Sequence, residues 1–294
     1  MDEEPAMELQ LGPVHYTRAQ GEMSMLLTTV TDDLCGKADL LGECGLALYL
    51  ETPRGTVLFD AGSGTTILGN LRALGFSPSE TDALVLSHGH ADHAGGVPQL
   101  LAAGLSCPLW ASPRIADAHY ARRGGIPRYL GLHLAPGALV VRPVTEPTQV
   151  LCDVWAIPVP GENRNPEFVP STPHLLLRQG GEYVPDPFED ELSLVVEGAF
   201  GISVILGCAH AGVVNILEAA AAFFGTHAFH SVSGGMHLKG QNAAFLERTV
   251  EALRSRFDVK HWRPCHCTGF TAAARLAEAM ESVEWAASGS RVEL

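Results

Sequence analysis

Three histidines and one aspartate fall within six consecutive residues, a density of metal ligands that ordinary packing does not require. The segment reads His88-Gly89-His90-Ala91-Asp92-His93. Structural zinc sites are normally closed by four Cys or His ligands, whereas catalytic sites mix His with a carboxylate and keep a position for water. His88 and His90 can turn to one ion, while Asp92 and His93 lie further along the turn and can face a second. The spacing predicts a two-metal catalytic centre; the alternative is a solvent-facing turn without metal.

The elements around this segment are expected to hold it at the edge of a sheet. Residues 82–87 form a short apolar run typical of a strand, and an apolar periodic stretch after Gly95-Gly96 predicts a helix to Ala103. The rest of the chain alternates predicted strands and helices, which by itself indicates an α/β protein. A strand fixes the position of the ligands, and the loop after it stays open to substrate.

The segment resembles the His-x-His-x-Asp-His signature of the metallo-β-lactamase superfamily. Phe59-Asp60-Ala61-Gly62 resembles the first acidic turn of that family. Three further segments resemble the branch named for dihydropterin-ribofuranosylaminobenzene phosphate synthase, and the likeness runs from about Leu26 almost to the C-terminus. These segments are Gly207-Cys208-Ala209-His210, Gly234-Gly235-Met236-His237-Leu238 and Pro264-Cys265-His266-Cys267-Thr268-Gly269. The resemblance implies a four-layer αββα sandwich of two mixed sheets, with the metals at one edge of the sheets.

The resemblance also implies where the remaining ligands lie. His210 and His266 each follow a predicted strand and are expected to bind metal, and Asp92 is expected to orient a metal-activated hydroxide as well. Cys208 stands where many members carry a metal-bridging Asp. Two interpretations of its role stay open: a thiolate that binds metal, or a buried thiol beside the site. For His237 we expect a proton donor to a leaving group or a contact with substrate phosphate, with a satisfied surface histidine as the alternative.

One segment departs from the wider superfamily. Most members have a metal-binding histidine after a Pro-Gly turn, but this chain has Pro160-Gly161-Glu162-Asn163. Either Glu162 coordinates in its place, or the ligand is His174 or His210. The residues from 161 to 191 are rich in Pro, Gly and acids, and we expect a long loop that acts as a lid or specificity segment. Cys265 and Cys267 are expected to be packing residues of a loop.

Composition limits the classes of partner. The 294 residues, 46% of them hydrophobic, suit one domain spanning 1–294, and a net charge of −14 opposes binding to a nucleic acid backbone. A small anionic substrate is compatible with that charge because divalent metals dominate the local field. The acidic start of the chain and the lack of a membrane-length apolar run predict a cytoplasmic protein without membrane contact. Seven cysteines with no regular spacing favour reduced thiols. Nothing in the sequence indicates an oligomeric state.

Together these features predict an enzyme: a dinuclear metal-dependent hydrolase or related transferase. Its expected substrate is a small, anionic or pterin- or phosphate-containing metabolite, and its expected cofactors are two divalent ions, zinc first, with manganese or iron as alternatives. A lactonase, thioesterase or phosphodiesterase activity on the same centre is the alternative within enzymes. A non-catalytic metal-site carrier or binding protein is the alternative outside them.

Overall fold

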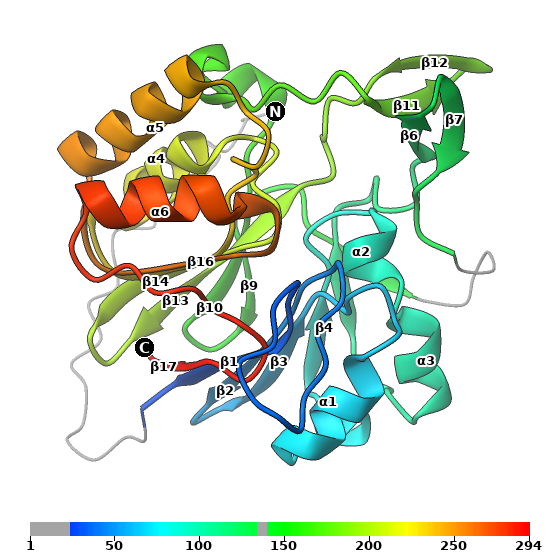
Figure 1. Cartoon of the computed structure of the whole chain (residues 1–294). Helices are drawn as coiled ribbons and strands as arrows, with labels where there is room; N and C mark the ends of the chain where they lie inside the picture. The colour runs from blue at the N-terminus through cyan, green and yellow to red at the C-terminus, as the bar shows by residue number, and fades with distance from the viewer. Residues whose placement is uncertain (1–23, 134–139) are drawn as a thin grey trace, which may run out of the picture.

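The computed structural model describes residues 24–133 and 140–294. The acidic N-terminal residues, and with them the expectation drawn from the start of the chain, lie outside the described residues. Two large mixed sheets and one small antiparallel sheet make up the strands of the described chain. Figure 1 shows the two large sheets packed between two groups of helices, with the small sheet standing apart from them.

The first large sheet has seven strands in the order β17-β1-β2-β3-β4-β5-β8. Neighbours from β17 to β3 run antiparallel, and those from β3 to β8 run parallel. The strands are β1 (Leu26–Thr31), β2 (Ala47–Thr52), β3 (Gly55–Phe59), β4 (Ala83–Val85), β5 (Leu109–Ala111), β8 (Val141–Pro143) and β17 (Arg291–Glu293). Strand β4 leads directly into the histidine segment, as the sequence predicted.

The second large sheet has six strands in the order β16-β15-β14-β13-β10-β9. These are β9 (Thr148–Leu151), β10 (Val154–Pro158), β13 (Leu192–Gly198), β14 (Gly201–Leu206), β15 (Ala228–Gly235) and β16 (Asp258–Cys265). Strands β14, β15 and β16 are parallel neighbours, so their carboxyl ends meet at one edge of the sheet. Ligands in open α/β sheets bind outside that edge.

Three apolar clusters fill the spaces between the layers. One joins the facing sides of the two large sheets through residues such as Leu48, Val57, Leu194 and Ile205. A second packs the outer side of the seven-stranded sheet against α1 (Ile67–Leu74) and α3 (Val97–Ala102), close to the short α2 (Ala91–Ala94). A third packs the outer side of the six-stranded sheet against α4 (Val213–Phe224), α5 (Ala243–Arg256) and α6 (Phe270–Ala279). The four-layer αββα sandwich is confirmed.

The third sheet was not predicted. Strands β6 (His119–Arg123), β7 (Ile126–Tyr129), β11 (Leu175–Gln179) and β12 (Glu182–Pro185) pair in the order β12-β11-β6-β7. Two of them, with the 3-10 turns η2 (Gly161–Asn163) and η3 (Pro166–Phe168), lie inside residues 161–191, so the expected long loop contains regular elements. Its role as a lid or specificity segment stays a prediction. Periodicity missed these strands because each has only four or five residues, and the β12 residues are mostly exposed.

Short elements complete the described chain. The 3-10 turn η1 (Pro78–Glu80) precedes β4, and η4 (His266–Thr268) follows β16. The longest helix of the described residues is α5, with 14 residues, and within the same part of the chain no helix has the length and apolar character needed to cross a bilayer.

Candidate metal centre

Five histidines from three segments of the chain meet at the edge of the two large sheets. They follow β4 (His88, His90, His93), β14 (His210) and β16 (His266), and each is at most 4% exposed. Within the described residues, one set of converging ligand atoms joins His88, Cys208 and His210, and another joins His93, Cys208 and His266. In each set the atoms lie within 4.8 Å of one another. Cys208 belongs to both sets, which places its sulfur between them.

Several ring nitrogens are left facing this centre. The hydroxyl proton of Ser87 is donated to Asp60 Oδ2. Ser87 Oγ, which lies 2.8 Å from His88 Nδ1, therefore accepts a hydrogen bond from that nitrogen. Nε2 of His88 and His90 and both ring nitrogens of His210 have no hydrogen-bond partner among the described residues. Buried polar atoms are costly to leave unpaired, so a group of such nitrogens fits an ion better than it fits a packed core.

Burial keeps several of these imidazoles neutral. It lowers the pKa of His90 to about 4, and the pKa values of His88 and His210 fall well below the ordinary range for the same reason, with neighbouring histidines adding to the effect. Metal binding requires the neutral imidazole, so these three side chains are ready to ligate without first losing a proton.

His93 is oriented by a carboxylate that the sequence analysis placed in a family turn but gave no role. Asp60, fully buried after β3, accepts from His93 Nδ1 at 2.6 Å. It also accepts from Ser87 N and Ser87 Oγ, each at 2.7 Å. Burial disfavours the charged ring of His93, but the charge and hydrogen bond of Asp60 outweigh burial and raise its pKa. Nε2 of His93 is then directed to Cys208 Sγ at 3.1 Å and His266 Nε2 at 3.3 Å.

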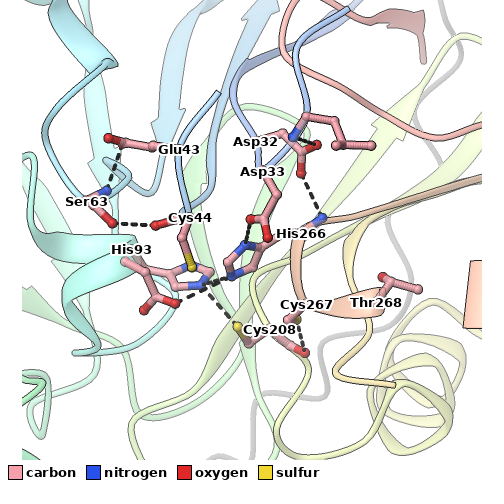
Figure 2. A network of polar contacts seen from close by, with 12 residues as sticks. Asp32, Asp33, Glu43, Cys44, Ser63, His93, Cys208, His266, Cys267 and Thr268 are labelled. Carbon is pink, nitrogen blue, oxygen red and sulfur yellow. Dashed lines mark hydrogen bonds and ion pairs between the residues drawn. The ribbon is translucent and has the colours of Figure 1, made fainter. Parts of the chain in front are cut away.

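His266 has a matching support from the loop after β1, which sequence reasoning missed. Figure 2 shows His93, Cys208 and His266 directed toward one another, with the Asp33 carboxylate next to the His266 ring. Asp33 Oδ1 accepts from His266 Nδ1 at 2.6 Å, and Asp32 Oδ1 accepts from the His266 backbone N–H at 2.7 Å. Metal-binding histidines commonly donate their second ring nitrogen to a carboxylate in this way. No motif could reveal the pairing, because more than 230 residues separate the partners.

Asp92 lies at the open side of the centre. Its carboxylate is 28% exposed, and Oδ2 is 3.6 Å from His266 Nε2. Burial opposes its ionisation, but the neighbouring imidazoles, His266 first and then His93 and His90, hold the pKa of Asp92 well below its usual range. A partly exposed, ionised carboxylate beside the His93 and His266 nitrogens is suited to bind an ion or to orient a water on it.

Cys208, His237 and Cys267 form a further group of converging ligand atoms. The His237 backbone N–H donates to Cys267 Sγ at 3.3 Å, and the His237 ring lies 4.2 Å from the His210 ring. Loop packing was predicted for Cys267, but the structure directs it into the centre. Cys265, by contrast, packs in the core between the large sheets, as a packing residue should. Burial raises the pKa of the Cys208 thiol well above its ordinary value, and a metal would remove that proton.

The backbone around these side chains adopts a conformation that few residues accept. Asp60, Ala209, His237 and His266 all have positive φ, between 47° and 63°. Such positions carry strain that the surrounding structure must offset, and they gather at functional sites. Their concentration here supports the view that ligand direction, rather than local stability, determined these turns.

The segment before β13 supports both ligand-bearing loops. Asp190 Oδ2 accepts from the Gly89 N–H, between the first two histidines, at 2.7 Å. Both carboxylate oxygens of Glu191 accept backbone N–H groups, from His210 and Ala211, each at 2.6 Å. The ring of Phe188 stacks on His210 with centroids 3.8 Å apart. The sequence analysis assigned these residues no role.

The three candidates for the ligand that replaces the family's histidine after the Pro-Gly turn lie in different surroundings. His210 lies in the centre, whereas Glu162 in η2 and His174 before β11 are exposed and belong to none of the converging groups found among the described residues. Of the residues predicted to bind metal, His88, His93, Cys208, His210 and His266 share two groups, and His90 belongs to a separate group with His119 and Asp186. Asp92 belongs to none of the groups found among the described residues.

This fold and this arrangement of histidines match a known family. The model of the metallo-β-lactamase superfamily matches residues 45–221, and the chain belongs to that superfamily. Its members generally bind metal ions, and the clustered histidine and cysteine side chains described above are of the types that bind such ions.

Individual relatives cover most of the chain. It is 27% identical over 263 residues to 7,8-dihydropterin-6-methyl-4-(β-D-ribofuranosyl)-aminobenzene-5'-phosphate synthase of Methanocaldococcus jannaschii, covering 83% of this chain and 87% of that protein. The solved structure of Tm1679, described as a metal-dependent hydrolase of the β-lactamase superfamily, has a TM-score of 0.78 and 28% identity, covering 92% of this chain and 99% of that one. YhfI from Bacillus subtilis shares the fold, with a TM-score of 0.52 at 12% identity, covering 92% of this chain and 99% of that one.

Proposed function

We propose that this protein is a metal-dependent enzyme with a dinuclear centre, a hydrolase or a related transferase acting on a small anionic metabolite. The observation that carries the proposal is the shared orientation of His88, His93 and His266. Each has Nδ1 against an oxygen acceptor, Ser87 Oγ, Asp60 or Asp33, so that Nε2 is left for an ion.

The donor set favours zinc and leaves room for harder ions. Imidazoles and one shared sulfur suit zinc, and Asp92 adds an oxygen that manganese and iron also accept. When bound at such a centre, divalent ions lower the pKa of a coordinated water to about 7 and polarise the group under attack. A transferase has separate support, because the archaeal relative is named as a synthase.

Two side chains of this chain would then act on the substrate. Asp92, ionised and at the open side, accepts a hydrogen bond from the attacking water and sets its direction. His237 is half-buried beside His210, and its Nδ1 has no hydrogen-bond partner among the described residues. It can donate a proton to a leaving group or hold a substrate phosphate. A pterin- or phosphate-containing metabolite is the substrate class we test first.

The test is metal content and turnover in the same preparations. Protein purified without added metal is analysed for zinc, iron and manganese, then assayed on phosphodiester, lactone and thioester substrates and on a phosphorylated pterin acceptor. The variant is His90→Ala, with His227→Ala as the control, because His227 is a surface histidine with 58% of its side chain exposed. We expect His90→Ala to lose metal and activity while its circular dichroism is unchanged, and His227→Ala to keep both.

Two results would defeat the proposal. Less than one equivalent of bound metal, with no gain on adding zinc or manganese, would favour a carrier or binding protein that lacks catalysis. Full turnover in His90→Ala would show that the reaction does not use this centre.

A further inference from the structure

We propose that Asp186 is a carboxylate ligand of the metal centre at His90, and that His119 positions it. The small sheet would then supply part of the centre, instead of only covering it. This inference rests on the proposed metal centre. It concerns residues outside the histidine motif and outside both large sheets.

The contacts of Asp186 leave one direction open. Its Oδ1 accepts from the Phe188 N–H at 2.9 Å, and its Oδ2 accepts from His119 Nδ1 at 2.6 Å. The same Oδ2 lies 4.0 Å from Nε2 of His90, and both side chains are at most 4% exposed. Nε2 of His90 has no hydrogen-bond partner among the described residues. An anionic oxygen and a buried, unpaired nitrogen therefore face each other across a small gap.

The width of the gap suits an ion. Zinc lies about 2.0 to 2.2 Å from His nitrogen and carboxylate oxygen, so two ligands of one ion can be at most roughly 4.2 Å apart, and about 3.4 Å apart in a tetrahedron. The 4.0 Å separation is inside that limit, and a small side-chain rotation gives the tetrahedral value. A direct hydrogen bond, with donor and acceptor about 2.9 Å apart, would need a larger shift.

His119 is buried between two carboxylates and makes a short hydrogen bond to one of them, which suits a positioning residue. It lies on β6 and is 2% exposed; Nδ1 donates to Asp186 Oδ2 at 2.6 Å, and Nε2 lies 3.3 Å from Asp190 Oδ2 but makes no hydrogen bond among the described residues. The ring also packs against Gly89, where a Cβ would collide with the Ile115 carbonyl oxygen and press on His119. Glycine at position 89 thus allows β6 to approach the histidine segment closely. Ligating carboxylates are commonly fixed by such a second hydrogen bond.

The experiment measures metal affinity directly. Zinc affinity is determined by competition with a chromogenic chelator, and the cobalt-substituted proteins are compared by their visible d–d bands. The variants are Asp186→Asn, His119→Ala and His119→Asn. The amide oxygen in Asp186→Asn can still accept from the Phe188 N–H, and the amide group in His119→Asn offers a donor near the former Nδ1 position. Glu182→Gln, which changes an exposed carboxylate on β12, is the matched control.

We expect Asp186→Asn and His119→Ala to weaken zinc binding at least 10-fold and to change the cobalt bands. His119→Asn should keep part of the affinity that His119→Ala loses. Glu182→Gln should match the wild type. Thermal melts of metal-free protein check folding. Wild-type affinity and cobalt bands in Asp186→Asn would overturn the inference while leaving the proposed function intact. A wild-type protein without metal or turnover would overturn the proposed function itself.

Discussion

Replacing Asp60 with asparagine should weaken metal binding by changing which nitrogen of His93 carries the proton. Asp60 accepts three hydrogen bonds, from Ser87 N, Ser87 Oγ and His93 Nδ1. An asparagine that keeps its oxygen on Ser87 N turns its NH₂ group toward His93. Nδ1 must then accept, and the proton moves to Nε2, the atom directed to Cys208 and His266. A protonated Nε2 cannot bind an ion.

The expected loss is 10- to 100-fold in affinity for one of the two ions, which is about 1.4 to 2.7 kcal/mol. Chelator competition and metal counting in the same sample measure it. Asp153→Asn is the control. Asp153 has nearly the same backbone φ as Asp60, 64° against 63°, but it lies in the turn between β9 and β10 and belongs to none of the converging groups of the described residues. Both substitutions keep a residue that tolerates positive φ. Two ions bound at wild-type affinity in Asp60→Asn would refute the argument that Asp60 sets the tautomer.

Two further predictions concern the same centre. Cys208→Ala should lose at least one equivalent of metal by elemental analysis if the thiolate bridges the two histidine groups, whereas unchanged content would assign Cys208 to packing. In metal-free protein, lowering the pH from 6.5 to 4 should reduce the free energy of unfolding, measured in urea, by up to about 3 kcal/mol through His90. The sign follows because burial lowers the folded pKa of His90 to about 4, so only the unfolded chain takes up the proton in that window. The variants His90→Phe and His90→Ala should lose this part of the pH dependence, and an unchanged slope would contradict it.

The large-scale fold was predictable because its signals are local or repeated. The apolar run before His88 is a strand, and the alternation of strands and helices is real, although which strands pair was available only through the resemblance. The small sheet was not predictable in the same way. Its four strands come from two hairpins, at 119–129 and 175–185, and pairing across about fifty residues leaves no periodic trace in a single sequence.

The clustering of the candidate ligands was predictable to the extent that their segments follow strands. His88, His90, His93, His210 and His266 meet as expected because β4 and the parallel strands β14 to β16 end at a common edge. Their supports were not predictable. Asp33 reaches His266 from the other end of the chain, and an acidic residue in an N-terminal loop looks the same in sequence whether it is solvated or paired.

The segment from Pro185 to Glu191 shows most clearly why composition misleads. A run of acids and prolines is typical of a solvated turn, yet Asp190 and Glu191 are at most 4% exposed and Asp186 has a side chain only 1% exposed. Each carboxylate has a backbone N–H or an imidazole to accept from, which is the condition under which buried acids are stable. Because those donors belong to Gly89, His119 and His210, the folding of this segment and the geometry of the metal centre depend on the same hydrogen bonds. A substitution that frees the segment should therefore disturb the ligands before it disturbs the sandwich.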